Sequence, residues 1–283
     1  MRILIIGANG LLGRDLVEDW TGDDIIPATS SDADIRDVDQ VRRLATREHP
    51  DWIVLTAGYT DVDGSERNSD QAFAVNRDGT INVSLVAREL GAKLCYLSTD
   101  YVFDGAAERP YEPDAPLHPL NAYGASKAGG EKAVQEFAGH WLIARTSWLF
   151  GTARPSFPEK ILLAADSQPE LRVVADQIGC PTYTRDLAQA IRELVRAEAR
   201  GILNITNSGS CSWFEFAKEI FQRAGRKTPV VPITSTEAGR PAKRPAYSVL
   251  SQRSLASQGI AMRAWQEALD AYLLELRRRR NLN

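Results

Sequence analysis

A tyrosine and a lysine four residues apart carry the clearest chemical signal in this sequence. The run Tyr-Gly-Ala-Ser-Lys places Tyr123 and Lys127 on one face of an expected helix, because residues four apart on a helix are neighbours. A lysine ammonium beside a phenol favours the phenolate and draws a tyrosine pKa of about 10 toward neutral pH. Such a tyrosine can pass a proton to or from an alcohol oxygen while a hydride moves at the adjacent carbon. The pattern indicates an oxidoreductase, although a lone Tyr-x-x-x-Lys pair also occurs by chance in many helices.

Polar residues at the end of an earlier apolar segment strengthen this prediction. Leu97 is followed by Ser98, Thr99 and Asp100, where a further polar group can bond the same substrate oxygen as the tyrosine. Asp100 either assists protonation or caps the following loop, and the sequence leaves both interpretations open.

A glycine-rich loop follows the first apolar segment. Its glycines are Gly7, Gly10 and Gly13, and a segment of helical period begins within the loop. Glycines permit a tight turn and let the backbone approach a pyrophosphate, while a helix N-terminus offers free N–H groups and a partial positive charge. The spacing is G-x-x-G-x-x-G rather than G-x-G-x-x-G. Its place at the start of an alternating series of strands and helices nevertheless predicts a dinucleotide site.

The end of the second expected strand bears on which dinucleotide binds. An acidic residue about 20 residues after the loop usually accepts hydrogen bonds from the adenosine ribose, but this segment reads Ala-Thr-Ser-Ser around Ser30. Small hydroxyl side chains leave room for a 2′-phosphate, and Arg14 could pair with that phosphate. NADPH is therefore favoured, and NADH stays open. Asp34 and Ile35 fit the next loop, where a carboxylate commonly meets the adenine amino group, or Asp34 simply caps the next helix.

The segments that must position these residues alternate between short apolar runs and longer runs of helical period. The expected strands are 2–6, 25–28, 52–56, 93–97 and 141–145, and the expected helices include 11–20, 38–48, 71–90 and 122–138. We therefore expect an α/β fold, a doubly wound parallel Rossmann sheet with a smaller C-terminal substrate-binding lobe. The dinucleotide-binding domain should span residues 1–145 with a return segment near 183–206. Residues 146–283, which hold most of the 14 prolines, should mainly form the lobe that binds a sugar nucleotide.

Composition excludes several other classes of protein. The chain has 283 residues and a formal net charge of −3, and it has no basic stripe, so no nucleic-acid partner is expected. Its three cysteines and three histidines are widely spaced, which argues against a disulfide framework and predicts no metal site. Because the sequence contains neither a signal-peptide pattern nor an apolar run of about 18 residues, we expect a cytoplasmic protein without a membrane partner.

Several motifs together resemble the extended short-chain dehydrogenase/reductase superfamily and, within it, most closely the dTDP-4-dehydrorhamnose reductase family. The resemblance spans essentially the whole chain, and the order of the motifs is much more specific than any one of them. The motifs are 7–13, 59–63, Asn76, 98–103, 119–121, 123–127, 145–148, 176–182 and 244–245.

The resemblance implies a reductase of dTDP-rhamnose biosynthesis, which reduces the 4-keto group of dTDP-4-dehydro-L-rhamnose with NAD(P)H. It implies Thr99, Tyr123 and Lys127 as the catalytic set, with Tyr123 as general acid. Together with the glycine loop, the expected cofactor-binding residues are Gly7, Gly10, Leu11, Leu12, Gly13, Ser30, Asp34, Ile35, Gly58, Tyr59, Thr60, Tyr123 and Lys127. By the same resemblance, the dTDP-sugar substrate would contact Thr99, Asp100 and Trp148.

The side chains of Trp148, Arg244 and Trp213 also indicate possible roles. Trp148 could stack on a sugar or base, or it could be a core residue between the lobes. Arg244 could bind the diphosphate as a bidentate donor, or it could be a solvated loop residue. Trp213 lies on a segment whose helical spacing predicts a core position rather than a ligand contact.

A few positions separate this chain from related patterns. Gly58 and Tyr59 replace an Ala-His pair often found before the threonine, and Ser156 stands where an asparagine is frequent. Superfamily dehydratases usually carry Thr-Asp-Glu after the fourth strand, whereas Tyr101 takes the glutamate position here. Ketone reduction is therefore favoured over elimination of water.

Two alternative functions stay open from the sequence. The chain could be a non-catalytic, nucleotide-binding regulatory subunit, since the beta subunit of methionine adenosyltransferase resembles this family, and fold alone does not imply activity. It could also reduce a different keto sugar nucleotide. The sequence does not decide the base and sugar of the substrate, a homodimer, or any role for magnesium.

Overall fold

A six-stranded sheet lies at the centre of the molecule. The computed structural model describes residues 1–280, and the strand order is β10-β5-β4-β3-β1-β2 with every neighbouring pair parallel. The strands are β1 (Arg2–Ile6), β2 (Asp24–Ala28), β3 (Trp52–Leu55), β4 (Lys93–Thr99), β5 (Trp141–Thr146) and β10 (Gly201–Asn204). The middle strands are almost entirely apolar and buried, because helices cover both faces of the sheet.

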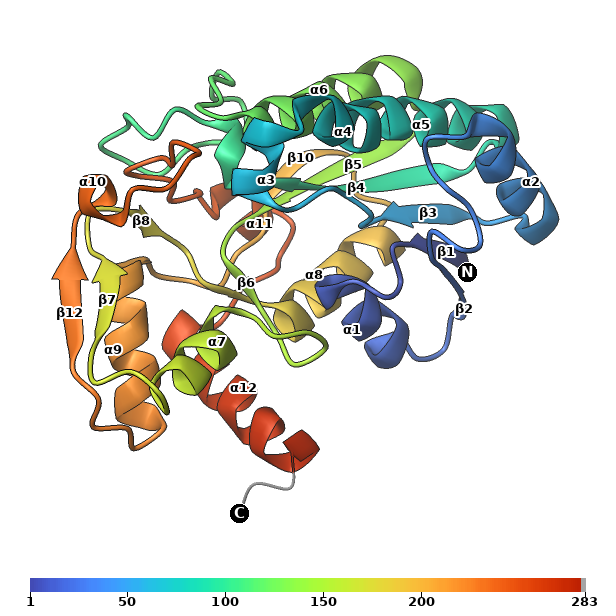
Figure 1. Ribbon diagram of the computed structural model, residues 1–283. Helices are drawn as coiled ribbons and strands as arrows, with labels where there is room; N and C mark the ends of the chain where they lie inside the picture. Colours follow the sequence, from blue (N-terminus) through green and yellow to red (C-terminus); the bar gives the residue numbers. More distant parts are fainter. Residues whose placement is uncertain (281–283) are drawn as a thin grey trace.

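Each face of the sheet has its own layer of helices (Figure 1). On one face lie α2 (Val38–Glu48), α5 (Gly79–Leu90) and α6 (Ala122–Phe137), and on the other lie α1 (Leu11–Asp19) and α8 (Thr184–Arg196). Alternate side chains of β1 point to the two layers of helices. Ile3 and Ile5 pack in the same buried cluster as side chains of α1 and α8. Leu4 and Ile6 pack with side chains of α2 and α5.

The observed elements confirm the predicted α/β fold with a doubly wound parallel sheet. Residues 2–6 and 38–48 form the expected strand and helix, and most other predicted ends differ by one or two residues. The helix predicted over 71–90 is confirmed in outline, but it begins at Ser69 and contains a π-helical turn that the sequence did not predict. That segment is α4 (Ser69–Phe73), a π-helical turn η1 (Ala74–Asp78) and then α5. The segment 183–206 contains α8 and β10, and β10 pairs with β5 at one edge of the sheet.

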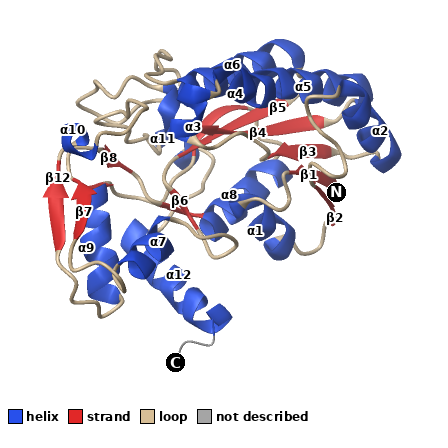
Figure 2. Cartoon of the chain, in the orientation of Figure 1, coloured by secondary structure: helices blue, strands red, loops and turns tan. Residues whose placement is uncertain are grey.

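A smaller lobe of short strands and helices lies beside the carboxyl edge of the sheet (Figure 2). Its elements are β6 (Leu149–Phe150), α7 (Phe157–Ala164), β7 (Leu171–Val174), β8 (Ile178–Gly179), β9 (Thr182–Tyr183), β11 (Cys211–Ser212), α9 (Trp213–Arg223), β12 (Val230–Ile233), α10 (Ser235–Ala238) and α12 (Trp265–Arg280). The short helix α11 (Arg253–Ala256) packs against β10 and the core of the sheet instead. An aromatic core that includes Phe150, Phe216 and Tyr272 holds much of this lobe together. Within residues 1–280, no helix has both the length and the apolarity needed to cross a bilayer.

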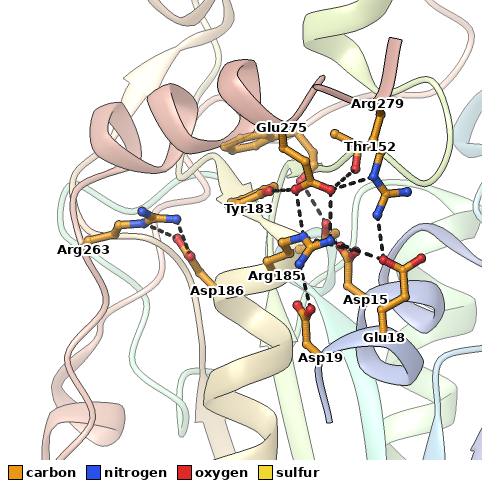
Figure 3. Close-up of polar contacts among 12 residues, drawn as sticks. Asp15, Glu18, Asp19, Thr152, Tyr183, Arg185, Asp186, Arg263, Glu275 and Arg279 are labelled. Atoms are coloured by element: carbon orange, nitrogen blue, oxygen red, sulfur yellow. Dashed lines mark hydrogen bonds and ion pairs between the residues drawn. The ribbon is translucent and has the colours of Figure 1, made fainter. Parts of the chain in front are cut away.

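Arg185 in the first turn of α8 joins the lobe to the helices of the sheet (Figure 3). Its guanidinium lies 2.7 Å from Asp19 and 3.3 Å from Glu18, both on α1, and 2.8 Å from Glu275 on α12. Arg279 adds a second bridge, at 2.7 Å from Glu18 and 2.8 Å from Glu275. The C-terminal helix is therefore attached to the first helix of the chain by two shared guanidinium groups.

Asp15 is the most buried member of this cluster. Its side chain is 1% exposed and lies 3.9 Å from Arg185. Burial raises the pKa of Asp15 to about 6, while Thr184 and Arg185 lower it. Arg185 is thus the cation that makes an ionised Asp15 tolerable in the folded protein.

Replacing Arg185 by alanine should lower the free energy of unfolding by about 1–3 kcal/mol at pH 8, because a buried carboxylate loses its counter-ion. The folded-state pKa of Asp15 is raised, so its ionisation opposes folding above a pH of about 6, and this opposition disappears as the pH falls toward the unfolded value. The defect should therefore shrink between pH 8 and pH 5. Urea unfolding at both pH values measures the difference.

Arg196→Ala is the matched control on the same helix. Arg196 is exposed and pairs with Asp23 at 2.8 Å, and Asp23 keeps a second cation in the N-terminal ammonium at 3.3 Å, so the loss of Arg196 should cost less than about 1 kcal/mol at either pH. Equal losses in the two variants at both pH values would contradict the role assigned to Arg185.

Candidate active site

The residues expected to do chemistry converge on one cleft of about 760 Å³. The cleft lies at the carboxyl ends of β1, β3, β4 and β5, which meet because the strands are parallel. β1 lies between β2 and β3, so the connections that leave β2 and β1 turn to opposite sides of the sheet. Open α/β sheets bind their ligands at such a switch point.

Most of the predicted site residues line this cleft. The predicted cofactor-binding residues that do so are Gly7, Gly10, Leu11, Leu12, Gly13, Ser30, Asp34, Ile35, Gly58, Thr60, Tyr123 and Lys127. The predicted substrate-binding residues that do so are Thr99, Asp100 and Trp148. Tyr59 and Arg244 are not among the lining residues. The backbone of Tyr59 is hydrogen-bonded to Asn76, and the side chain of Arg244 is paired with Asp63.

The glycine loop brings the backbone of β1 close to its neighbours. Gly7 has φ +98°, and a Cβ there would lie 2.5 Å from the Ala57 nitrogen. A Cβ on Gly13 would lie 2.1 Å from the Gly7 carbonyl oxygen, so α1 packs against the loop with no room for a side chain. Gly10 caps α1 without a side-chain hydrogen bond, which leaves N–H groups at the helix start for an anion.

A carboxylate and a guanidinium lie together where the loop after β2 lines the cleft. Arg36 donates to Asp34 at 3.0 Å from Nε, and this hydrogen bond lowers the pKa of Asp34. Both residues line the cleft with Ser30. Arg14, which the sequence suggested as a phosphate ligand, is exposed on α1 and is not among the lining residues. Arg36 is therefore a cation of the loop after β2 that lines the cleft together with Ser30.

Tyr123 stands in the first turn of α6. The helix begins there because the Asn121 side chain accepts a hydrogen bond from the Gly124 N–H at 2.7 Å. Burial raises the pKa of Tyr123 to about 12, a hydrogen bond with Thr99 lowers it, and the charge of Asp100 raises it. The expectation that Lys127 draws this pKa toward neutrality is therefore wrong for the ligand-free protein, because burial outweighs any such attraction. The phenol is protonated at neutral pH.

Lys127 lies one turn further along α6 and is buried. Its Nζ donates to the Leu97 carbonyl at 2.6 Å and lies 4.1 Å from the centre of the Tyr96 ring. Burial lowers the pKa of Lys127 to about 7, and the nearby Glu131 raises it. Its charge is therefore poised to respond to a bound ligand.

A buried ion pair lies beneath these residues. Arg145 on β5 donates to both carboxylate oxygens of Glu131 on α6, at 2.8 and 2.7 Å, and the Ser98 hydroxyl donates to the same carboxylate at 2.5 Å. Glu131 is fully buried and Arg145 is 1% exposed. The pair fixes α6 over the ends of β4 and β5.

The π-helical turn η1 contains Asn76, which the sequence singled out only through the family motif. Its side-chain oxygen accepts from the Tyr59 N–H at 2.8 Å, and its amide donates to the Tyr59 carbonyl at 3.0 Å and to the Ser126 hydroxyl at 2.9 Å. Asn76 thus joins the loop after β3 to helix α6. Tyr59 takes part through its backbone, and its hydroxyl lies toward Gly64, where an added Cβ would be 2.8 Å away, whereas Gly58 and Thr60 line the cleft.

The lobe supplies aromatic and cationic groups to the other side of the cleft. Trp148 has a left-handed φ of 46° and stacks on Trp213, with ring centres 3.7 Å apart. Both rings line the cleft, as do Arg154 and Lys160. The prediction of a core position for Trp213 captures only half of its role, since it packs with the lobe core and also faces the cleft. The positive charges of Arg154, next to Pro155, and of Lys160, on α7, are the sequence signal that points to this side of the cleft.

Arg244 is held away from the cleft by a carboxylate. Its guanidinium contacts Asp63 through two hydrogen bonds, at 3.1 and 2.9 Å. It also interacts with the hydroxyl of Tyr101, whose ring lies edge-on to Tyr123 at 5.8 Å. Because Asp63 already occupies the bidentate face of Arg244, the cations that line the substrate side are Arg154 and Lys160.

Comparisons with known proteins agree over the full length of the chain. A model of the family described as RmlD substrate binding domain matches residues 1–278. The spore coat polysaccharide biosynthesis protein SpsK of Bacillus subtilis (strain 168) is 41% identical over 97% of this chain and 97% of its own length. A dTDP-4-dehydrorhamnose reductase of Burkholderia thailandensis is 35% identical over 98% of this chain and 99% of its own length. The crystal structure of dTDP-4-dehydrorhamnose reductase from Bacillus anthracis str. Ames in complex with NADP has a TM-score of 0.95 and 40% identity, and the match covers 97% of this chain and 99% of that chain.

Gly13→Ala should weaken dinucleotide binding at least about tenfold and lower the free energy of unfolding by about 1–3 kcal/mol, because the new Cβ forces α1 away from the loop. Fluorescence titration with a reduced dinucleotide and urea unfolding measure the two effects. Gly139→Ala is the control, since the nearest atom to a Cβ there is the Arg88 Cγ at 4.0 Å. Wild-type affinity in Gly13→Ala would show that the loop does not hold the dinucleotide.

Proposed function

The chain belongs to the RmlD substrate binding domain family, the family of the dTDP-4-dehydrorhamnose reductases, and we propose that it reduces dTDP-4-dehydro-L-rhamnose to dTDP-L-rhamnose with NADPH. One observation carries this proposal: a single cleft joins the glycine loop to Thr99, Tyr123 and Lys127. Relatives named as reductases match this chain over nearly its whole length, which supports the same activity.

The cofactor end of the cleft fits a phosphorylated dinucleotide. The glycine loop excludes side chains and the start of α1 offers uncapped N–H groups, as a pyrophosphate requires. Ser30 brings no negative charge, and Arg36, which lines the same cleft, pairs with Asp34 through Nε and one terminal nitrogen and offers its other terminal nitrogen to a 2′-phosphate. A relative of 40% identity was solved with NADP. NADPH supplies the hydride that reaches the sugar carbon C4.

The chain's own residues provide the proton and the alignment. Tyr123 donates its proton to the carbonyl oxygen, and its raised pKa keeps it in the acid form that reduction needs. Thr99 orients the phenol, and Lys127 holds the ribose. General acid catalysis of this kind contributes about 10²–10⁴-fold to the rate.

The lobe side of the cleft suits a sugar nucleotide. Arg154 and Lys160 bring positive charge for the diphosphate, and Trp148 with Trp213 forms an aromatic wall. Asp100 lies beside Thr99 at the same end of the cleft. Tyr101 supplies no elimination base, which favours simple ketone reduction over dehydration.

An enzyme is supported over a regulatory subunit. A module that only binds nucleotide does not need an acid, a hydroxyl and an ammonium in one cleft, yet Thr99, Tyr123 and Lys127 all line it. A keto sugar nucleotide with another sugar or base remains the second candidate, and the substrate assay decides between them.

The organisation of the chain follows from this function. Residues 1–145, with α8 and β10, serve the cofactor, and most of the remainder through residue 283 serves the sugar nucleotide, although residues 281–283 lie outside the described part. We place the enzyme in the cytoplasm, where its three free, buried cysteines stay reduced. A homodimer is compatible with this arrangement.

Tyr123→Phe should lower kcat at least about a hundredfold while the dissociation constant for NADPH stays within about twofold, because only the transferred proton is lost. Oxidation of NADPH with dTDP-4-dehydro-L-rhamnose, followed at 340 nm, measures turnover. Tyr101→Phe is the matched control, a second phenol in the same cleft, and it should keep kcat within about fivefold. Full activity in Tyr123→Phe would refute the assignment, and turnover of other keto sugar nucleotides alone would identify the second candidate.

Ser30→Asp should lower kcat/KM for NADPH at least about tenfold and leave kcat/KM for NADH nearly unchanged, because a carboxylate repels the 2′-phosphate and accepts from a ribose hydroxyl. Ser31→Asp adds the same charge at an exposed neighbour that is not among the lining residues, and it should have little effect. An equal loss of kcat/KM with NADPH and with NADH would show that Ser30 does not contact the 2′-phosphate.

A further inference from the structure

A serine outside the predicted catalytic set forms a hydrogen bond with Asp100, the carboxylate next to Thr99 in the site. The Ser248 hydroxyl donates to Asp100 Oδ2 at 2.6 Å, and the Thr99 hydroxyl donates to Asp100 Oδ1 at 3.0 Å. A further hydrogen bond links Thr99 to the phenol of Tyr123. Ser248 is 1% exposed and Asp100 is 2% exposed. Ser248 lies between α10 and α11, so the C-terminal half of the chain contacts the end of β4.

The single proton of Thr99 sets the direction of this hydrogen-bond chain. A hydroxyl has one proton and two lone pairs. Thr99 gives its proton to Asp100 and accepts from the Tyr101 N–H at 3.2 Å, which leaves one lone pair for the Tyr123 hydroxyl. Thr99 then has no proton to give to Tyr123, so the phenol keeps its own proton, which is the one that the substrate carbonyl oxygen receives in the proposed reaction. This direction holds only while Asp100 is ionised.

We propose that Ser248 is a positioning residue for the catalytic acid: its hydroxyl holds the Asp100 carboxylate ionised and directed at Thr99, which orients the Tyr123 phenol. Ser248 acts through Asp100 and is not among the residues that line the cleft. The inference rests on the function proposed above.

The surroundings of Asp100 make this hydrogen bond important. The titratable groups that face it are Tyr101 of η2 (Asp100–Val102), Tyr123 of α6, and Cys180 between β8 and β9. Burial raises the pKa of all three, to about 12 for Tyr123 and about 11 for Cys180, so all three are neutral at pH 7. None of the three carries a positive charge. Burial raises the pKa of Asp100 to about 6, and the hydrogen bonds from Ser248 and Thr99 oppose a larger rise.

Ser248→Ala tests the proposal through the pH profile of kcat. Loss of a donor to a charged carboxylate should raise the pKa of Asp100 by about one unit. The kcat should then fall about fivefold at pH 6 and stay within about twofold of wild type at pH 8, with little change in KM. Ser248→Thr keeps the hydroxyl and should restore the wild-type profile.

Two further variants make the test independent of folding defects. Ser251→Ala is the matched control, because Ser251 is also buried in this segment, and its hydroxyl accepts only a weak bond from the Arg253 N–H at 3.4 Å. Its profile should equal that of the wild type. Ser248→Cys replaces the hydroxyl with a weaker donor at similar volume, and it provides the same measurement where the alanine variant does not fold.

A titration without substrate decides the inference separately from turnover. In protein labelled with [4-¹³C]aspartate, the Asp100 signal is assigned by its absence in Asp100→Asn, and its pKa should be about one unit higher in Ser248→Ala than in wild type. An unchanged titration, or an equal loss of kcat at pH 6 and pH 8, would overturn the proposal. A wild-type protein that turns over no keto sugar nucleotide would refute the proposed function, and the titration alone would then decide whether Ser248 holds Asp100.

Discussion

The buried ion pair between Glu131 and Arg145 is the constraint on which the rest of the site depends. Two hydrogen bonds join the guanidinium to the carboxylate, and the Ser98 hydroxyl donates a third hydrogen bond to the same carboxylate. Breaking one partner of a buried pair typically costs about 3–5 kcal/mol, because the other charge stays buried without compensation. Glu131 lies one turn after Lys127 on α6, and Ser98 directly precedes Thr99 on β4. The pair therefore fixes the distance between the helix and the strand that together carry the catalytic groups.

Burial, more than attraction between charges, sets the protonation states in this site. It raises the pKa of Tyr123 to about 12 and lowers that of Lys127 to about 7. Both shifts favour the neutral form of the group. A phenol that keeps its proton is suited to donate that proton to a carbonyl oxygen, which agrees with reduction as the forward reaction. A bound dinucleotide brings phosphates and a ribose to the same cleft, so the charge of Lys127 is the property most open to change on binding.

The two halves of the chain share the site through a small number of long-range contacts. The bond from Ser248 to Asp100 spans 148 positions of sequence, and the pair of Arg244 with Asp63 spans 181. A third long-range contact is made by Arg185, which connects α1 with α12. The C-terminal half of the chain therefore contributes groups that can bind ligand. It also holds in place two carboxylates of the N-terminal half, Asp63 and Asp100.

Local patterns in the sequence were enough to predict the α/β alternation, the glycine loop and the Tyr-x-x-x-Lys pair, because each depends on neighbours a few residues apart. The π-helical turn around Asn76 within this helical segment was not predicted, since helical period alone does not report a side chain that bonds a distant loop. The positions of Arg244 and Ser248 were decided only by tertiary structure. A guanidinium or hydroxyl can bond any suitable partner, and which partner lies within 3 Å depends on how distant segments pack. The sequence thus determined the kind of chemistry, and the packing decided the proton state of Tyr123 and the groups that position it.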